Sequence, residues 1–214
     1  AAFFGIRGLV KSSLDAGDTQ KALSYARTAL EQNPKQPWIL KSVYDLEIQS
    51  HKWEDAYRTL QKLSKHKVVD TNKIISDEIA LLMILAQNDM ASGNEDGWKN
   101  KVERAHKLDA TFVPAITALG NYWIERGKAG KVSSMVEKAW KIAPHPDLAL
   151  LWDKIAPMPK ASDPLRRLRW FEKLMAINPD SADGKLAAAK VAMECGLNGQ
   201  AREYLESALE IRPT

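Results

Sequence analysis

The sequence predicts an all-α fold, a right-handed superhelical solenoid of about six stacked helix pairs. Three observations predict it. Apolar residues recur at spacings of three and four, which places them on single helix faces. Most segments of 34 or 35 residues contain a central break, usually a glycine, and the same small residues return from one segment to the next. One helix pair cannot bury its own apolar face, so neighbouring pairs must stack.

Residues 113–144 show the repeated unit most completely. Gly120 and Ala139 are small where two helices must cross closely, Gly127 ends the first helix, and Pro144 stops the second. This spacing is the tetratricopeptide repeat pattern. The same spacing along the chain places units that start near residues 3, 37, 79, 113, 148 and 182.

Two departures from the period are informative. The second and third units start 42 residues apart, from 37 to 79, and residues 64–78 supply the excess as an insertion that should lengthen two helices and their loop. In the fifth unit, Pro157 and Pro159 should cut the first helix short. Because a solenoid grows by addition, we predict a single repeat domain over residues 1–214.

Composition narrows the function classes. The 45% hydrophobic and 27% charged content is that of an ordinary globular chain, and no apolar run reaches the length of a membrane span. A net charge of +4 is compatible with an acidic partner or an anionic membrane surface, but it lacks the basic stripe of a nucleic-acid binder. The single cysteine, Cys195, excludes an internal disulfide framework, and we interpret it as a packed, inert thiol.

The sequence offers few candidates for chemistry. The four histidines are scattered without the i, i+4 spacing of a helical metal site, and His145 is explained by its place at a helix junction beside Pro146. There is no glycine-rich phosphate loop and no nucleophile elbow. We therefore predict no catalytic residues, no metal, no cofactor and no enzymatic activity; an enzyme of unknown reaction is the second alternative.

Binding is the better hypothesis, because the first helices of stacked pairs line a concave groove. The partner-binding candidates at its inward positions are Arg7, Lys11, Trp38, Lys41, Asp45, Met83, Gln87, Met90, Asn121 and Trp152. Phe4, Gln49, Glu125, Lys190 and Met193 occupy equivalent positions. The cations suit a carboxylate or phosphate, and the tryptophan and methionines suit an adaptable apolar floor. The alternative is a groove of ordinary solvated charge with its aromatics packed into the stack.

Two further surfaces stand out. The run 166–170, Arg-Arg-Leu-Arg-Trp, falls on a second helix and therefore on the convex side, where it is either a surface for a membrane or acidic partner or a solvated face. The last unit ends with Leu205, Ala208 and Leu209 uncovered, so we expect this end to form a homodimer or to be covered by a further C-terminal region. Four tryptophans occupy turn or seam positions and are interpreted as packing: Trp53, Trp98, Trp123 and Trp140.

Three stretches carry a family resemblance. They are the junction 139–148, Ala-Trp-Lys-Ile-Ala-Pro-His-Pro-Asp-Leu; the upstream 112–115; and the closing region from 186–189 through 201–206 to 213–214. Together with Arg7-Gly8-Leu9 and the following Gly17-Asp18, these residues resemble the HemY family of bacterial inner-membrane tetratricopeptide proteins. The resemblance covers nearly the whole chain, and the junction is its most specific part.

The resemblance implies an N-terminal membrane anchor that this chain lacks, a soluble domain on the cytoplasmic side of the inner membrane, and an association with late protohaem synthesis. It transfers no catalytic residues. We therefore predict a scaffold that recruits or regulates a protein partner, such as a haem-biosynthesis enzyme. The first alternative is direct haem or porphyrin binding in the groove by Trp38, Met83, Met90 and Lys41.

Overall fold

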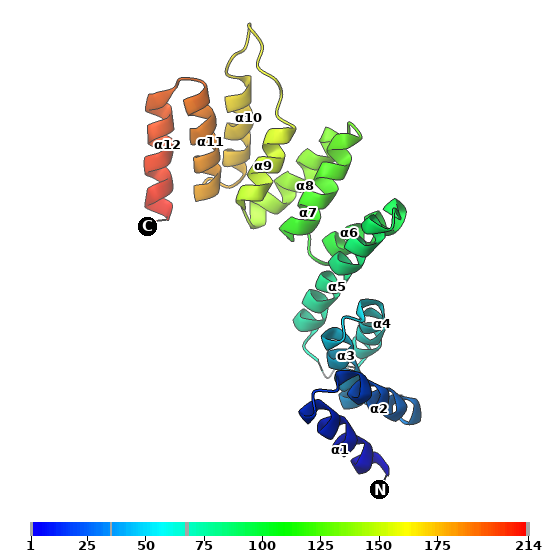
Figure 1. Ribbon diagram of the computed structural model, residues 1–214. Helices are drawn as coiled ribbons and strands as arrows, with labels where there is room; N and C mark the ends of the chain where they lie inside the picture. Colours follow the sequence, from blue (N-terminus) through cyan, green and yellow to red (C-terminus); the bar gives the residue numbers. More distant parts are fainter. Residues whose placement is uncertain (1, 35, 67–68, 213–214) are drawn as a thin grey trace. The chain divides into compact units, whose positions relative to one another are not determined.

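The structure, a computed structural model, describes residues 2–34, 36–66 and 69–212, with side chains from residue 5 onward. Its elements are α-helices joined by turns, which confirms the predicted all-α class (Figure 1). Helix packing divides the chain into two compact units, Ala1–Leu108 and Asp109–Thr214. The single continuous domain expected from the sequence stays a prediction.

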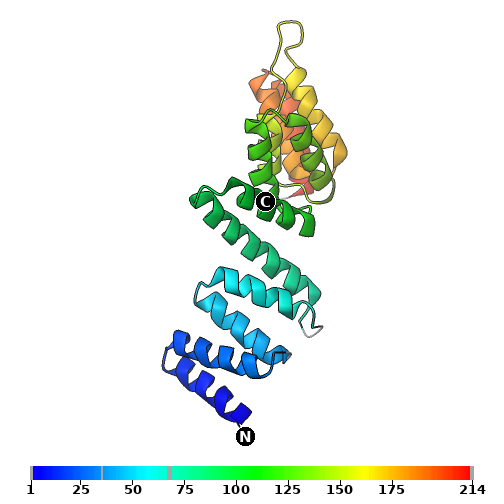
Figure 2. The same cartoon turned by 90° about the vertical axis from the view of Figure 1, so that its right-hand side faces the viewer.

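Unit 1 contains three helix pairs, whose six helices follow one another in chain order (Figure 2). They are α1 (Ala2–Asp15), α2 (Thr19–Gln32), α3 (Pro37–Gln49), α4 (Trp53–Leu63), α5 (Thr71–Ala91) and α6 (Glu95–Leu108). Each helix packs closely against the next one along the chain. The core between α2 and α3 joins small residues to branched ones: Ala22, Ala26 and Ala29 pack with Ile39 and Val43. Close approach through alanines therefore holds the first two pairs together, as the repeat pattern predicts.

The insertion at residues 64–78 lengthens one helix, α5, and not the two that the sequence predicts, because α4 ends at Leu63 after 11 residues. α5 begins at Thr71, where the Asp70 side chain accepts a hydrogen bond from the backbone N–H of Asn72 at 3.1 Å. Ile74, inside the inserted segment, is buried in the core formed with α3 and α4. The insertion thus extends the N-terminal end of α5 and joins the core of unit 1.

Unit 2 contains the other three pairs. Its helices are α7 (Val113–Glu125), α8 (Ala129–Ile142), α9 (Pro146–Lys154), α10 (Arg166–Ile177), α11 (Ala182–Glu194) and α12 (Asn198–Ile211). Here α7 packs directly against α9, and α9 against α11. Gly120 makes the first of these contacts possible, because a Cβ added there would lie 2.8 Å from Cδ1 of the buried Leu151. The small residue predicted at a helix crossing is therefore required by packing.

The junction between α8 and α9 behaves as its sequence predicts. Pro146 is the first residue of α9, and the His145 ring caps the helix because its Nδ1 accepts a hydrogen bond from the Asp147 N–H at 3.1 Å. α9 ends at Lys154, just before Pro157 and Pro159, and spans nine residues. The loop at 155–165 then connects α9 to α10 (Figure 1).

Neither a metal-binding cluster nor a membrane-spanning helix is found in the described part of the chain. No group of three or more His, Cys, Asp or Glu residues there is placed to hold a metal ion. No helix among residues 2–34, 36–66 and 69–212 combines the length and apolar character needed to cross a bilayer.

Candidate partner-binding grooves

The first groove lies in unit 1, and we call it the α1–α3 groove. It has a cavity volume of about 380 Å³, and α1, α2 and α3 line it. Half of the ten predicted binding residues line this one cavity: Arg7, Lys11, Trp38, Lys41 and Asp45. The regular spacing of the first two repeats therefore brings α1 and α3 side chains to one surface, as the sequence predicts.

Positive charge exceeds negative charge in the α1–α3 groove. Cζ of Arg7 lies 5.5 Å from the ring centroid of Trp38, a cation–π distance. Lys41 Nζ lies 2.6 Å from Asp45 Oδ2, but the two side chains are 60% and 47% exposed, so water weakens this ion pair. Three cations thus face one carboxylate, and Lys11 is also exposed. An anionic group can enter without displacing a buried partner.

The predicted residues of α5 lie outside this cavity. Met83 is half-buried, Gln87 is exposed, and the Met90 side chain is 49% exposed. The lining of the α1–α3 groove comes from α1, α2 and α3, so these residues do not complete one pocket with Trp38. The side chain of Phe4 lies outside the described residues.

Two predicted residues lie in unit 2. Asn121 is exposed, and its Oδ1 accepts a hydrogen bond from Lys154 Nζ at 2.8 Å. Trp152 is a correction: its residue is 0% exposed, and its ring stacks on Trp170 with centroids 4.2 Å apart. Each indole N–H of this pair donates to the backbone carbonyl of the other tryptophan, at 3.0 and 3.1 Å. Trp152 therefore joins α9 to α10 and cannot touch a partner.

The other tryptophans pack as predicted. Trp140 is 0% and Trp123 9% exposed, whereas Trp53 and Trp98 are half-buried. Large aromatic rings at these turn and seam positions bury much apolar area in the stack.

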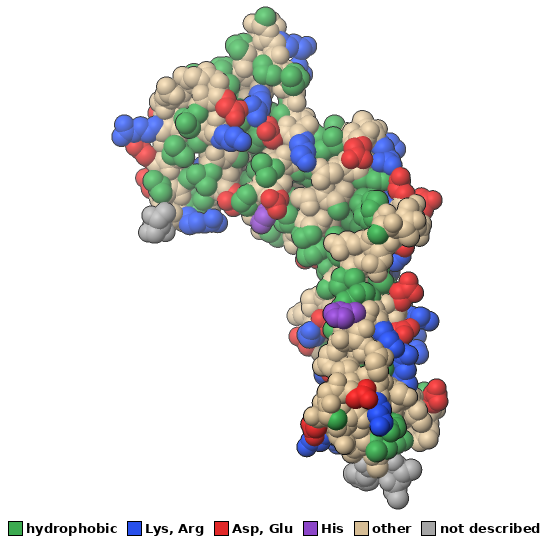
Figure 3. Space-filling view, in the orientation of Figure 1, with side chains coloured by type: hydrophobic (Ala, Val, Ile, Leu, Met, Phe, Trp, Pro, Cys, Tyr) green, Lys and Arg blue, Asp and Glu red, His purple; other side chains and the backbone are tan. Residues whose placement is uncertain are grey.

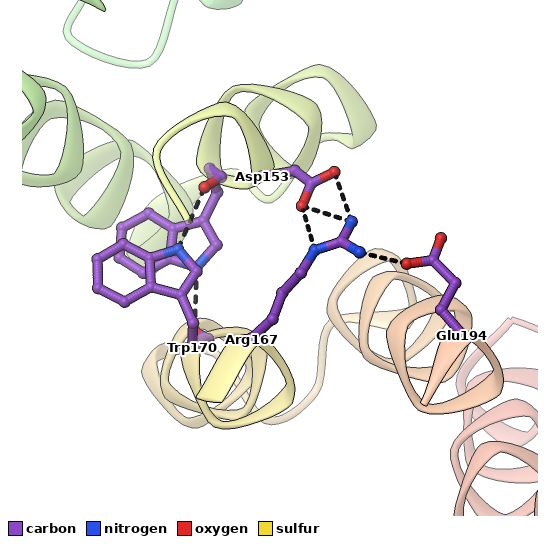
Figure 4. A network of polar contacts seen from close by, with 5 residues as sticks. Asp153, Arg167, Trp170 and Glu194 are labelled. Atoms are coloured by element: carbon purple, nitrogen blue, oxygen red, sulfur yellow. Dashed lines mark hydrogen bonds and ion pairs between the residues drawn. The ribbon is translucent and has the colours of Figure 1, made fainter. Parts of the chain in front are cut away.

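Two arginines of the basic run at 166–170 are paired with carboxylates of the chain itself. The Arg167 guanidinium donates three hydrogen bonds to the Asp153 carboxylate, at 3.0, 2.8 and 2.9 Å, and a further one to Glu194 (Figure 4). Arg169 pairs with Asp163. Two of the three arginines are thus bound by carboxylates of the chain itself. Arg167 is therefore a structural tie, whereas Arg169 stays 57% exposed, which is compatible with the solvated-face interpretation of the run.

The electrostatics of Arg167 agree with this role. Burial alone would lower the pKa of Arg167, but the hydrogen bond to Asp153 and the charges of Asp153 and Glu194 together raise it above its usual value. The three residues come from α9, α10 and α11. One guanidinium therefore joins three helices of unit 2.

The second groove lies where these three helices meet, and we call it the α9–α11 groove. Its cavity of about 260 Å³ is lined mainly by apolar residues, among them Ala149, Leu150, Phe171 and Leu186, together with the charged Asp153, Arg167, Asp183 and Lys190. Leu150 is 56% and Leu186 46% exposed. Of these lining residues, only Lys190 was assigned to a groove position from the sequence. The signal for Leu150 was the run Leu-Ala-Leu-Leu at 148–151, because four successive apolar residues on a helix cannot all face one core.

The sequence also predicts an uncovered apolar surface on the last helix and a packed thiol at Cys195. Leu205 and Leu209 on α12 are 38% and 54% exposed, but Ala208 is buried, so the expected apolar surface is smaller than predicted. Homodimerisation through this end stays a prediction. Cys195 is partly buried at the C-terminal cap of α11.

Comparison with known proteins bears on the repeats. Residues 13–72 match the family model of the tetratricopeptide repeat. The probable magnetosome protein Mms48 of Magnetospirillum gryphiswaldense is 30% identical over 109 residues, which are 51% of this chain and 24% of that protein. The match therefore spans about a quarter of the length of this curated relative.

Solved structures with a similar chain path include two bacterial repeat proteins. A tetratricopeptide repeat protein from Parabacteroides merdae is 14% identical, with 99% of this chain and 80% of that chain covered and a TM-score of 0.43. The C-terminal part of a repeat-containing protein from Cytophaga hutchinsonii is 17% identical, with 98% and 78% covered and a TM-score of 0.42. The sequence match at 13–72 and the helix pairs together make this a tetratricopeptide-like protein, an architecture that serves protein–protein interaction.

Proposed function

We propose that this protein is a non-catalytic scaffold whose α1–α3 groove binds an acidic, partly apolar segment of a partner protein. The observation that carries the proposal is the gathering of Arg7, Lys11 and Lys41 around a half-buried tryptophan in one cavity of about 380 Å³. Exposed cations attract a carboxylate, and Trp38 offers a rigid apolar contact beside Ile6.

The energetics suit reversible recruitment. Each exposed ion pair contributes about 0.2–1 kcal/mol and weakens with salt. The aromatic contact is less sensitive to salt, since burying apolar area does not depend on charge. A segment that makes both the ion pair and the aromatic contact must carry a carboxylate next to a large apolar side chain.

We further propose that the partner is a protein of late protohaem synthesis and that it is recruited at the bacterial inner membrane, with this domain on the cytoplasmic side. The support is the resemblance of the junction 139–148 and of the closing residues to the HemY family. The repeat architecture is equally compatible with recruiting a partner and with regulating it.

Binding to purified enzymes of the last protohaem steps tests both parts. The immobilised protein is compared with an Arg7→Glu/Lys11→Glu variant by interferometry, and the matched control reverses two exposed lysines elsewhere, Lys21→Glu/Lys138→Glu. We expect one enzyme to bind and the groove variant to lose at least about ten-fold in affinity, while the control stays within about two-fold. Circular dichroism checks that both variants remain helical.

The two parts of the proposal fail separately. Equal loss in the groove and control variants would show that net charge, and not the α1–α3 groove, drives binding. If no protohaem enzyme binds better than an unrelated acidic protein, the proposed partner class is wrong.

A further inference from the structure

We propose that the α9–α11 groove is a second, independent binding site, which takes a peptide segment with one apolar anchor side chain followed by a carboxylate. It differs from the α1–α3 groove in residues and in chemistry, so either site can fail without the other. The ligand is a segment of a partner protein, and the groove recognises its apolar side chain and its carboxylate.

The walls of the α9–α11 groove are fixed before any ligand arrives. Arg167 on α10 holds Asp153 on α9 and Glu194 on α11, and the stacked pair of Trp152 and Trp170 holds α9 to α10 (Figure 4). Fixed walls reduce the entropy lost when a ligand binds. The groove is therefore preorganised.

The centre of the groove is apolar and small. Leu150 and Leu186 flank it, half or nearly half exposed, and the nearly buried Phe171 and Ala149 also line it. Its volume of about 260 Å³ is below the roughly 300–1,000 Å³ of sites for cofactors and drug-sized ligands. It suits a single large apolar side chain from a peptide. Figure 3 shows hydrophobic side chains interspersed with both signs of charge over the helices of unit 2.

The charges of the groove select the neighbouring residue of the ligand. The single positive charge of Arg167 is shared by the carboxylates of Asp153 and Glu194. Asp183 Oδ2 lies 3.8 Å from Nη2 of Arg212, which forms an ion pair with it. Lys190 is exposed, and within residues 69–212 no carboxylate is placed in an ion pair with it. Its ammonium is the charge that a ligand can satisfy, and it requires an Asp or Glu.

A displayed library of random 12-residue peptides is the probe. Selection on the whole protein is followed by counter-selection on a Leu150→Glu/Leu186→Glu variant, and enriched peptides are synthesised and measured by fluorescence anisotropy. Ile142→Glu is the matched control, because Ile142 is 72% exposed on α8 and lies outside the groove lining. Thermal unfolding confirms that the variants fold.

We expect enriched peptides to share a Leu, Ile, Met or Phe at a fixed distance from an Asp or Glu. Either leucine substitution should weaken them at least about ten-fold, and Ile142→Glu should leave them within about two-fold. Lys190→Glu should weaken them roughly three-fold, Lys190→Arg should bind like the original, and a peptide with Lys in place of its acidic residue should recover binding to Lys190→Glu.

Three results would overturn the inference. One is a selection that enriches no peptide. Another is a set of peptides that bind the double leucine variant with the same affinity as the original protein. The third is sedimentation that shows self-association lost on Leu186→Glu, which would assign the groove to a second copy of the chain. The Arg7→Glu/Lys11→Glu variant should bind the selected peptides normally, which separates this site from the α1–α3 groove.

Discussion

Replacing Arg167 by methionine should loosen three helices of unit 2 at once. Methionine keeps most of the apolar stem but removes the guanidinium, which donates three hydrogen bonds to Asp153 and one to Glu194. The two carboxylates then lose their partner while remaining about a third exposed, at 30% and 42%. Water can partly hydrate both carboxylates, which limits the loss of stability.

The magnitude follows from that exposure. Buried charge-assisted hydrogen bonds contribute about 1.5–3 kcal/mol, and fully exposed ion pairs about 0.2–1 kcal/mol. Arg167 is 27% exposed and lies between these cases, so we expect its loss to cost about 1–2 kcal/mol. For a unit of this size that corresponds to a fall of roughly 5–10 °C in the unfolding temperature of unit 2.

Urea unfolding and hydrogen exchange measure the effect and its location. Exchange should rise in α9, α10 and α11 and stay unchanged in unit 1. A double-mutant cycle with Asp153→Asn should give a coupling of about 1 kcal/mol. The control is Arg169→Met, because Arg169 is 57% exposed and should cost no more than a few tenths of a kcal/mol. If both arginine substitutions cost the same, or if exchange rises along the whole chain, Arg167 does not hold these helices together.

Three other outcomes can be measured directly. Gly120→Ala should lower the free energy of unfolding by about 1–2 kcal/mol, because its Cβ would meet the buried Leu151, whereas Gly130→Ala, with open space around it, should stabilise by up to about 1 kcal/mol in denaturant titrations. The hydrogen bond from Arg27 lowers the pKa of Asp55 against the effect of burial. A depressed folded pKa gives stability that is lost as pH falls through it, so Arg27→Met should lose less stability than the original protein between about pH 5 and about pH 2. Haem added to the protein should give no defined Soret shift, since the α5 methionines lie outside the cavity that holds the groove tryptophan.

Helix ends were predictable because the turn position imposes one backbone conformation. Four predicted or equivalent turn glycines have positive φ: Gly17, Gly93, Gly127 and Gly196. His51 occupies the same position in the second repeat and adopts φ 54°, in the left-handed region where glycine is usual. The repeat spacing therefore determines this turn even where the residue is unfavourable.

Groove residues were predictable only where the repeat is regular. In unit 1 the spacing from Arg7 to Trp38 and Lys41 holds, and these side chains line one cavity. In the fifth repeat, the first helix, α9, spans only nine residues. The position expected to face the groove there holds the buried Trp152. The same position rule therefore succeeds in a full-length helix pair and fails in a shortened one.

Charge at the basic run could not be judged from local sequence. Arg167 finds its carboxylates 14 residues before it, at Asp153, and 27 residues after it, at Glu194. Nothing in the intervening spacing marks these residues as partners, because the pairing depends on how α9, α10 and α11 pack. Within this basic run, Arg167 thus contributes to an internal tie that its neighbours in the sequence do not indicate.

This difference in charge pairing gives the two grooves responses to salt that differ in size. In the α1–α3 groove, cations face one exposed carboxylate, so a ligand depends on ion pairs that salt screens over about 8–10 Å. In the α9–α11 groove, Arg167 is paired with Asp153 and Asp183 with Arg212, and the rest of the lining, apart from Lys190, is apolar. Raising the salt concentration from about 0.05 M to about 0.5 M should therefore weaken a ligand of the first groove much more than one of the second. Equal salt dependence in anisotropy titrations would mean that charge at Lys190, and not the apolar anchor, dominates the second site.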